Sequence, residues 1–113
     1  MYVKVLDVSN NRILQLGKWG FRKMMSLKVL NFDDNLLKTV GGLTFERSHK
    51  LEDVSFAHNR ISKISSNMFD KFNGVKRLNF AGNQLTFLAK SLILVKASLI
   101  FLCWKLKNKE CLS

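Results

Sequence analysis

Apolar residues recur along this chain at a fixed interval of 24 residues. Four segments fall into register at this step, and they begin at Val3, Leu27, Leu51 and Val75. They read VKVLDVSNNRI, LKVLNFDDNLL, LEDVSFAHNRI and VKRLNFAGNQL. Each fits the pattern L-x-x-L-x-L-x-x-N-x-L, with aliphatic residues or Phe at the L positions. Self-similarity at a fixed period of this length is the signature of a repeat architecture.

The pattern extends beyond these four segments into the second half of each repeat. Eight columns hold the expected residue class at 30 of 32 positions, and the exceptions are Ser48 and Lys96. Because only 47% of the residues are hydrophobic, such agreement excludes chance. One of the later columns consists of Phe21, Phe45 and Phe69, continued by Ile93. A regular spacing of one aromatic ring per repeat predicts a packed spine rather than a cofactor site.

The alternation inside each segment predicts a short strand. In the first repeat Leu6 and Val8 point to one face, whereas Val5, Asp7 and Ser9 point to the other. No repeat can bury its apolar face alone, so the strands are expected to stack into a parallel sheet.

This pattern resembles the leucine-rich-repeat family in its 24-residue typical subclass, and it is similar to the ectodomains of Toll-like receptors and secreted insect immune proteins. The resemblance covers Val3 to about Leu88. It implies an α/β solenoid, a horseshoe segment with a short parallel sheet on its concave face and irregular or short helical turns on its convex face. It also implies that asparagine amides bond to backbone groups of their own turn and of the neighbouring repeat, in a ladder of Asn11, Asn35, Asn59 and Asn83.

The concave face is where this architecture implies a ligand, and we predict a protein ligand there. The strand residues expected on that face carry five acidic and four basic side chains, with an acidic middle. The candidate ligand-binding residues are Asp7, Asn31, Asp33, Asp34, Asp53, Ser55, His58, Arg77 and Asn79. The resemblance further implies an immune-recognition or receptor-type role.

Charge and candidate chemistry change this picture little. The formal net charge of +11 would normally indicate a nucleic-acid or other anionic partner. The basic residues are scattered over the predicted convex turns and the C-terminal end, however, and the aromatic residues belong to core columns, which argues against a nucleic-acid site. The sequence has no nucleophile–base pair, no phosphate-binding glycine loop and no His/Cys spacing of a metal site. We therefore predict no enzyme activity, no metal and no cofactor.

The domain prediction is four repeats over residues 1–98, followed at 99–113 by a degenerate fifth repeat or an apolar and basic tail. Residues 87–104 are strongly apolar but contain Lys90 and Lys96. A membrane span needs roughly 20 mainly apolar residues, and each central lysine costs about 2.5–3.5 kcal/mol. The fifth-repeat interpretation is favoured, while membrane association through 87–104 stays open. Three residues fall in the first three apolar columns, namely Leu99, Leu102 and Trp104.

The chain ends lead to a second hypothesis about function. Met1, Tyr2 and Val3 run directly into strand-like sequence, so no signal peptide is expected within this chain. The resemblance implies that the parent protein is secreted or is a membrane-receptor ectodomain. The cysteine-rich caps of the relatives are missing at both ends, so we expect self-association through uncapped ends. The alternative is a truncated fragment of a larger receptor, with a membrane-associating tail and no independent activity.

Overall fold

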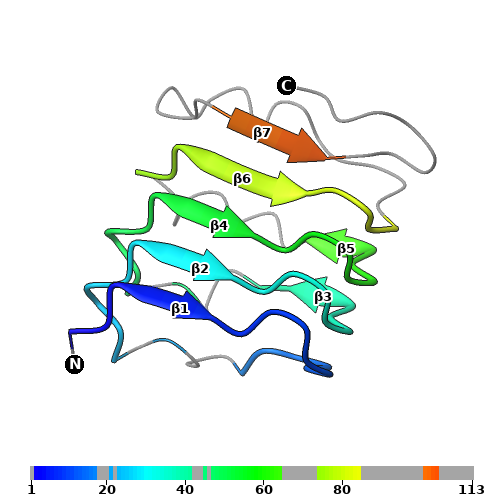
Figure 1. The fold of residues 1–113 in the computed structure, drawn as a ribbon, viewed down its shortest axis with the longest axis horizontal. Helices are drawn as coiled ribbons and strands as arrows, with labels where there is room; N and C mark the ends of the chain where they lie inside the picture. The colour runs from blue at the N-terminus through cyan, green and yellow to red at the C-terminus, as the bar shows by residue number, and fades with distance from the viewer. Residues whose placement is uncertain are drawn as a thin grey trace.

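Short parallel strands at 24-residue intervals form the main sheet of the protein (Figure 1). The computed structural model describes residues 2–17, 21, 23–41, 45, 47–64, 74–84 and 101–104, the last as backbone only. The main sheet contains, in spatial order, β1 (Val5–Asp7), β2 (Val29–Asn31), β4 (Asp53–Ser55), β6 (Arg77–Phe80) and β7 (Phe101–Trp104). A second parallel sheet is formed by β3 (Thr39–Val40) and β5 (Lys63–Ile64).

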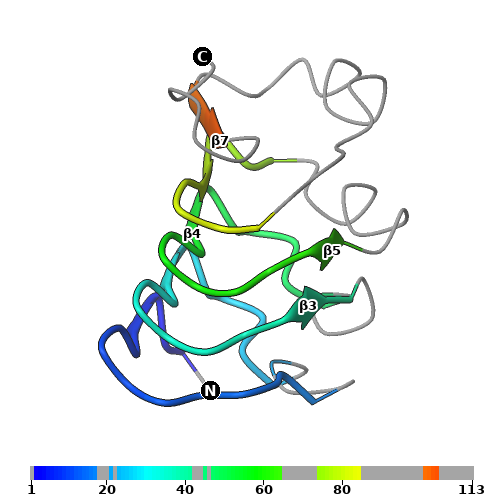
Figure 2. The same cartoon turned by 90° about the vertical axis from the view of Figure 1, so that its right-hand side faces the viewer.

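Each repeat makes one turn of a coil. Figure 2, turned by 90°, shows the main sheet on one side of the coil and the β3–β5 sheet on another. The predicted repeat solenoid with a parallel sheet is confirmed. The turns between the sheets are irregular, and no α-helix occurs in the part of the chain that the structure describes.

The strands pair in register at the repeat step. The middle residues of the three-residue strands align as Leu6, Leu30 and Val54, and Leu78 of β6 continues that row. The β7 strand extends the sheet at the same step, because Leu102 lies opposite Leu78 and Trp104 lies opposite Phe80. We propose on this pairing that residues 99–113 begin as a degenerate fifth repeat.

The membrane interpretation of residues 87–104 concerns mostly residues outside the described part of the chain. Only 101–104 of this segment are described, and they form β7. Within the described residues, no helix has the length and apolar character needed to cross a membrane.

Two stacks of phenylalanine rings fill the core between the two sheets. One stack holds Phe32, Phe56 and Phe80, with ring centroids 5.8 and 5.5 Å apart and nearly parallel planes. In the other, Phe21 and Phe45 stack at 5.3 Å. Edge-to-face contacts, at 5.7 Å for Phe21 on Phe32 and 6.0 Å for Phe45 on Phe56, join the two stacks. The predicted third ring of the second stack, Phe69, lies outside the described residues.

Buried asparagines connect each repeat to the one before it. The side-chain nitrogen of Asn59 donates to Phe56 O and Ala57 O of its own turn and to Phe32 O of the preceding repeat, at 3.1, 3.3 and 2.9 Å. Its side-chain oxygen accepts from Leu37 N of that preceding repeat at 3.1 Å. The same four bonds recur at Asn35 and Asn83.

The first asparagine of the column differs from the other three. Asn11 is exposed, and its amide donates only to Val8 O and Ser9 O of its own turn, at 2.8 and 3.1 Å. The buried members therefore serve two repeats at once, whereas Asn11 serves one.

Ser48 is the polar exception in an otherwise apolar column, and the structure buries it. It is 1% exposed, and its hydroxyl has no hydrogen-bond partner among the described residues. Its main-chain N–H donates to Phe45 O at 3.0 Å, in the turn that Met24 N makes to Phe21 O one repeat earlier. The backbone of this turn therefore needs no hydroxyl at position 48.

Loss of a ladder amide is expected to depend on its place in the column. Asn59→Ala leaves several buried backbone groups without partners and should lower the free energy of unfolding by about 1–3 kcal/mol. Asn11→Ala removes two exposed local bonds, so it should cost distinctly less. Urea denaturation of both variants, followed by far-UV circular dichroism, measures the difference. Equal losses at the two positions would contradict the ladder as the link between repeats.

Removal of the buried hydroxyl should stabilise the fold. We expect Ser48→Ala to raise the free energy of unfolding by about 1 kcal/mol, because an unsatisfied buried polar group costs about that much or more. Ser62→Ala, at an exposed position just before β5, is the control and should stay within about 0.5 kcal/mol of the parent protein. A destabilised Ser48→Ala protein would mean that the hydroxyl has a stabilising role.

Candidate functional site

The candidate site is the outer face of the main sheet, which is the face turned away from the phenylalanine core, together with the turn that follows each strand. The predicted ligand-binding residues fall there in four columns, with one residue per repeat in each. The column at the strand starts is Val5, Val29, Asp53 and Arg77. The next outward column is Asp7, Asn31, Ser55 and Asn79. Asp33 belongs to a third column, and Asp34 and His58 belong to a fourth.

Side chains of the second column hold the turn that follows their own strand. The side-chain oxygen of Asn31 accepts from Asp33 N at 2.8 Å, and that of Asn79 accepts from Ala81 N at 2.9 Å. Asx side chains bond in this way to the backbone two residues on, and so mimic a turn. These oxygens are therefore used by the fold itself.

Asp7 makes the same turn in the first repeat with an additional bond. Its carboxylate accepts from the Ser9 hydroxyl at 2.6 Å and from Ser9 N at 3.0 Å. The Ser9 hydroxyl bond, followed by the Ser9 main-chain bond, lowers the pKa of the Asp7 carboxyl from its ordinary value, because both bonds favour the charged form.

In the third repeat, the acceptor for the backbone N–H of the turn comes from the preceding repeat. Ser55 stands where the other repeats have Asp or Asn, and Ala57 N donates instead to the Asp33 carboxylate of the preceding repeat at 2.8 Å. The Ser55 hydroxyl donates to the same carboxylate oxygen at 2.5 Å. Asp33 thus stabilises the turn of the next repeat, which explains a carboxylate at this half-buried position.

The fourth column has a left-handed backbone. Asn10, Asp34 and His58 have φ angles of 57°, 58° and 57°, and Gly82 has 70°. Asn, Asp, His and Gly are the residues that adopt this conformation most readily. The residue types at Asp34 and His58 therefore follow from the backbone.

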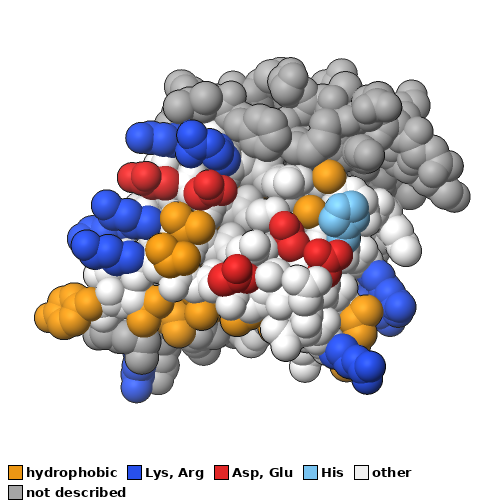
Figure 3. All heavy atoms as spheres, in the orientation of Figure 1, with side chains coloured by type: hydrophobic (Ala, Val, Ile, Leu, Met, Phe, Trp, Pro, Cys, Tyr) orange, Lys and Arg blue, Asp and Glu red, His pale blue; other side chains and the backbone are white. Residues whose placement is uncertain are grey.

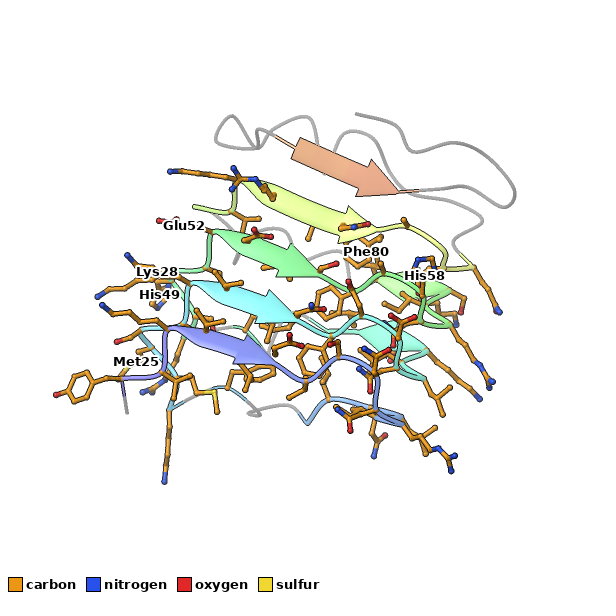
Figure 4. All side chains as sticks on the ribbon, viewed as in Figure 1. Met25, Lys28, His49, Glu52, His58 and Phe80 are labelled. Atoms are coloured by element: carbon orange, nitrogen blue, oxygen red, sulfur yellow. The ribbon has the colours of Figure 1, made fainter. Side chains whose placement is uncertain are left out.

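Gly82 also makes room for the histidine of the preceding repeat. A Cβ atom on Gly82 would lie 2.4 Å from the His58 Nδ1 atom, so the imidazole ring occupies the space that a side chain would fill. Figure 4 shows His58 beyond the ends of the strands, away from Lys28 and Glu52 at the strand starts.

The strand starts have a different chemistry. Val5 is 62% exposed, and Val29 and Asp53 are half-buried next to it in register. One position earlier in each repeat stand Lys4, Lys28, Glu52 and Lys76. None of the side chains in these two columns makes a hydrogen bond or an ion pair with the residues that the structure describes. The same residues are fixed through their backbone, because Lys28 O accepts from Glu52 N and Asp53 N at 2.9 and 3.1 Å.

Both charge signs occur on this face. Figure 3 shows basic, acidic and hydrophobic side chains side by side over the strand starts, and a second acidic group nearer the strand ends. The described residues contain no group of three or more His, Cys, Asp or Glu placed to hold a metal ion. The arrangement offers groups for noncovalent contact, namely charged and apolar side chains on a regular sheet.

The columns of the outward residues are predictable from the sequence, but their different roles are not. The predicted ligand-binding group contains the Asx and left-handed positions, and it does not contain Lys28, Glu52 and Lys76. The signal that separates the roles was present in part, since Asp or Asn stands two residues before the turn in three of the four repeats.

Comparison with protein families supports the repeat assignment. A family model described as leucine rich repeat matches residues 2–54 and, in a second overlapping placement, residues 33–85. Together the two matches span about three quarters of the chain. Comparison with curated proteins found no match.

The role of Asp33 can be tested by replacing it and then restoring its bond. Asp33→Ala leaves Ala57 N and the Ser55 hydroxyl without their acceptor and should destabilise the protein by about 1 kcal/mol. Adding Ser55→Asn should recover most of that loss, because an asparagine there can accept from Ala57 N as Asn31 and Asn79 do in their own turns. Urea unfolding of the single and double variants measures both effects.

Asp53→Ala is the control for this pair, since it removes a carboxylate that makes no hydrogen bond to the described residues. It should change stability by no more than about 0.5 kcal/mol. If Ser55→Asn fails to rescue Asp33→Ala, the assigned role of Asp33 is wrong.

Proposed function

The chain belongs to the leucine-rich-repeat family, and we propose that it binds a protein partner through the outer face of the main sheet. Domains of this family generally mediate protein–protein interaction and are typically non-enzymatic. A repeat scaffold of this kind presents a regular array of side chains, and the partner is decided by those side chains rather than by the fold.

One observation carries the proposal. The strand-start columns present side chains that make no hydrogen bond or ion pair within the described residues, on a backbone that is bonded from repeat to repeat. The inward residues of the same strands, Leu30, Val54 and Leu78, are at most 2% exposed. Because the backbone of this surface is already ordered, binding loses little backbone conformational entropy, which favours affinity.

We also propose a receptor-type role in immune recognition for this interaction. The support is the 24-residue repeat length, which the chain shares by resemblance with Toll-like-receptor and secreted insect immune ectodomains. Binding of the full chain to a panel of extracellular proteins, compared with a panel of cytosolic ones, tests this part. Binding confined to cytosolic proteins would overturn it.

A partner-independent experiment tests the binding face. Peptides that bind the immobilised full chain are selected from a random library displayed on phage, and their affinities are measured by biolayer interferometry. A variant carrying Asp34→Asn, Asp53→Lys and Arg77→Glu changes two columns of the outer face, because Asp53 and Arg77 both stand at strand starts and Asp34 stands in the left-handed column. It should bind the selected peptides about tenfold more weakly or worse, because interface charges and their partners are disrupted together.

The control variant carries Lys38→Glu and Lys63→Glu. These exposed lysines lie just before β3 and in β5, away from the main sheet. This variant should keep the parent affinity. Peptide binding that survives the outer-face changes and is lost with the control changes would place the interaction elsewhere and overturn the proposal.

A further inference from the structure

On the outer face, the two ends of the strands differ in whether their side chains are hydrogen-bonded within the protein. At the strand ends, the side-chain oxygens of Asp7, Asn31 and Asn79 hold turns, and Asp33 holds the turn of the next repeat. In the column of Asn10, Asp34, His58 and Gly82, the left-handed backbone explains the residue types. The polar character of this half is therefore largely a property of the fold.

The side chains at the strand starts hold no turn in the part of the chain that the structure describes. We define the strand-start strip as three adjacent pairs of residues, one pair from each of repeats two to four: Lys28 and Val29, Glu52 and Asp53, Lys76 and Arg77. Their side chains make no hydrogen bond or ion pair with other described residues. Figure 4 shows Lys28 and Glu52 at this end of the sheet, one strand apart.

The backbone holds these pairs at fixed spacing. Glu52 O accepts from Lys76 N and Arg77 N at 2.7 and 3.0 Å. In the same way, Lys28 O accepts from Glu52 N and Asp53 N. Adjacent strands of a sheet lie about 4.8 Å apart. The charge of the strip therefore changes sign over that distance, from one strand to the next. The order is basic, acidic, basic, with Val29 as an apolar group beside the first step.

This order of charges favours one class of partner over another. A nucleic acid or another uniform polyanion would set negative charge against Glu52 and Asp53, between the two basic pairs, and like charges in contact cost affinity. A protein surface can place both signs and an apolar side chain as needed. The same alternation that disfavours a polyanion therefore gives specificity for a protein of matching pattern.

We infer that the strand-start strip is the principal partner contact, and that the partner is a protein segment with acidic side chains opposite Lys76 and Arg77, a basic side chain opposite Glu52 and Asp53, and an apolar side chain over Val29. This inference rests on the proposed function and narrows it to one half of the outer face. Repeat one continues the strip with Lys4 and Val5, so the contact extends toward β1.

The test exchanges charges within the strip. The variant E52K/D53R/K76E/R77D keeps the net charge of +11 but reverses the sign of two neighbouring pairs. Peptides selected from the phage library on the parent protein should bind it about tenfold more weakly, because each reversed charge meets a like charge. Peptides selected afresh on the variant should carry acidic and basic residues in the reversed order.

The matched variant at the strand ends is Asp34→Asn, which keeps a residue that tolerates the left-handed backbone. It should retain the parent affinity. Far-UV circular dichroism and thermal melting show whether each variant is folded. Lysine acetylation of the parent protein gives a measurement without any substitution: bound peptide should protect Lys28 and Lys76 but not Lys38 and Lys63.

The outcomes separate this inference from the proposed function. If Asp34→Asn weakens binding and the charge exchange does not, the inference is wrong, while binding through the outer face still holds. If neither variant matters and neither strip lysine is protected, both are wrong. A short DNA duplex that binds the full chain at physiological salt and protects the strip lysines would replace the protein partner with a polyanion.

Discussion

The link between successive repeats is a buried asparagine amide, and the rest of the structure depends on it. Each of the three buried ladder amides, those of Asn35, Asn59 and Asn83, satisfies backbone groups on two neighbouring repeats. This requirement recurs every 24 residues and so fixes the length of every repeat. With the length fixed, the strands align without shift, and the phenylalanine rings of successive repeats stack one above the other.

The same regularity explains why much of the outer face is polar for structural reasons. Every strand must end in a turn, and each turn needs an acceptor for one backbone N–H and a residue that tolerates a left-handed backbone. Asn31 and Asn79 supply the acceptor within their own repeats, while Asp33 supplies it across the boundary to Ala57. The strand starts have no comparable requirement, and the side chains there make no hydrogen bond or ion pair with the residues that the structure describes.

Much of the fold could be predicted from the sequence, because its causes are local and repeated. The strand positions, the inward row that includes Leu30 and the spacing of Phe21 and Phe45 follow from alternation and period. The roles within the candidate site could not be predicted in the same way. Asp33 bonds to residues 22 and 24 positions away, and an acidic residue just after a strand looks the same in sequence whether it holds a turn or faces solvent.

The sequence by itself therefore determined the period, the inward face and the columns in which outward residues stand, since these depend only on residue type and spacing. Tertiary structure alone decided which outward side chains are already bonded, that the Ser48 hydroxyl is buried without a partner among the described residues, and that the His58 ring fills the space above Gly82. The physical reason is that hydrogen-bond satisfaction is a property of contacts between repeats, and contacts exist only once the repeats are stacked.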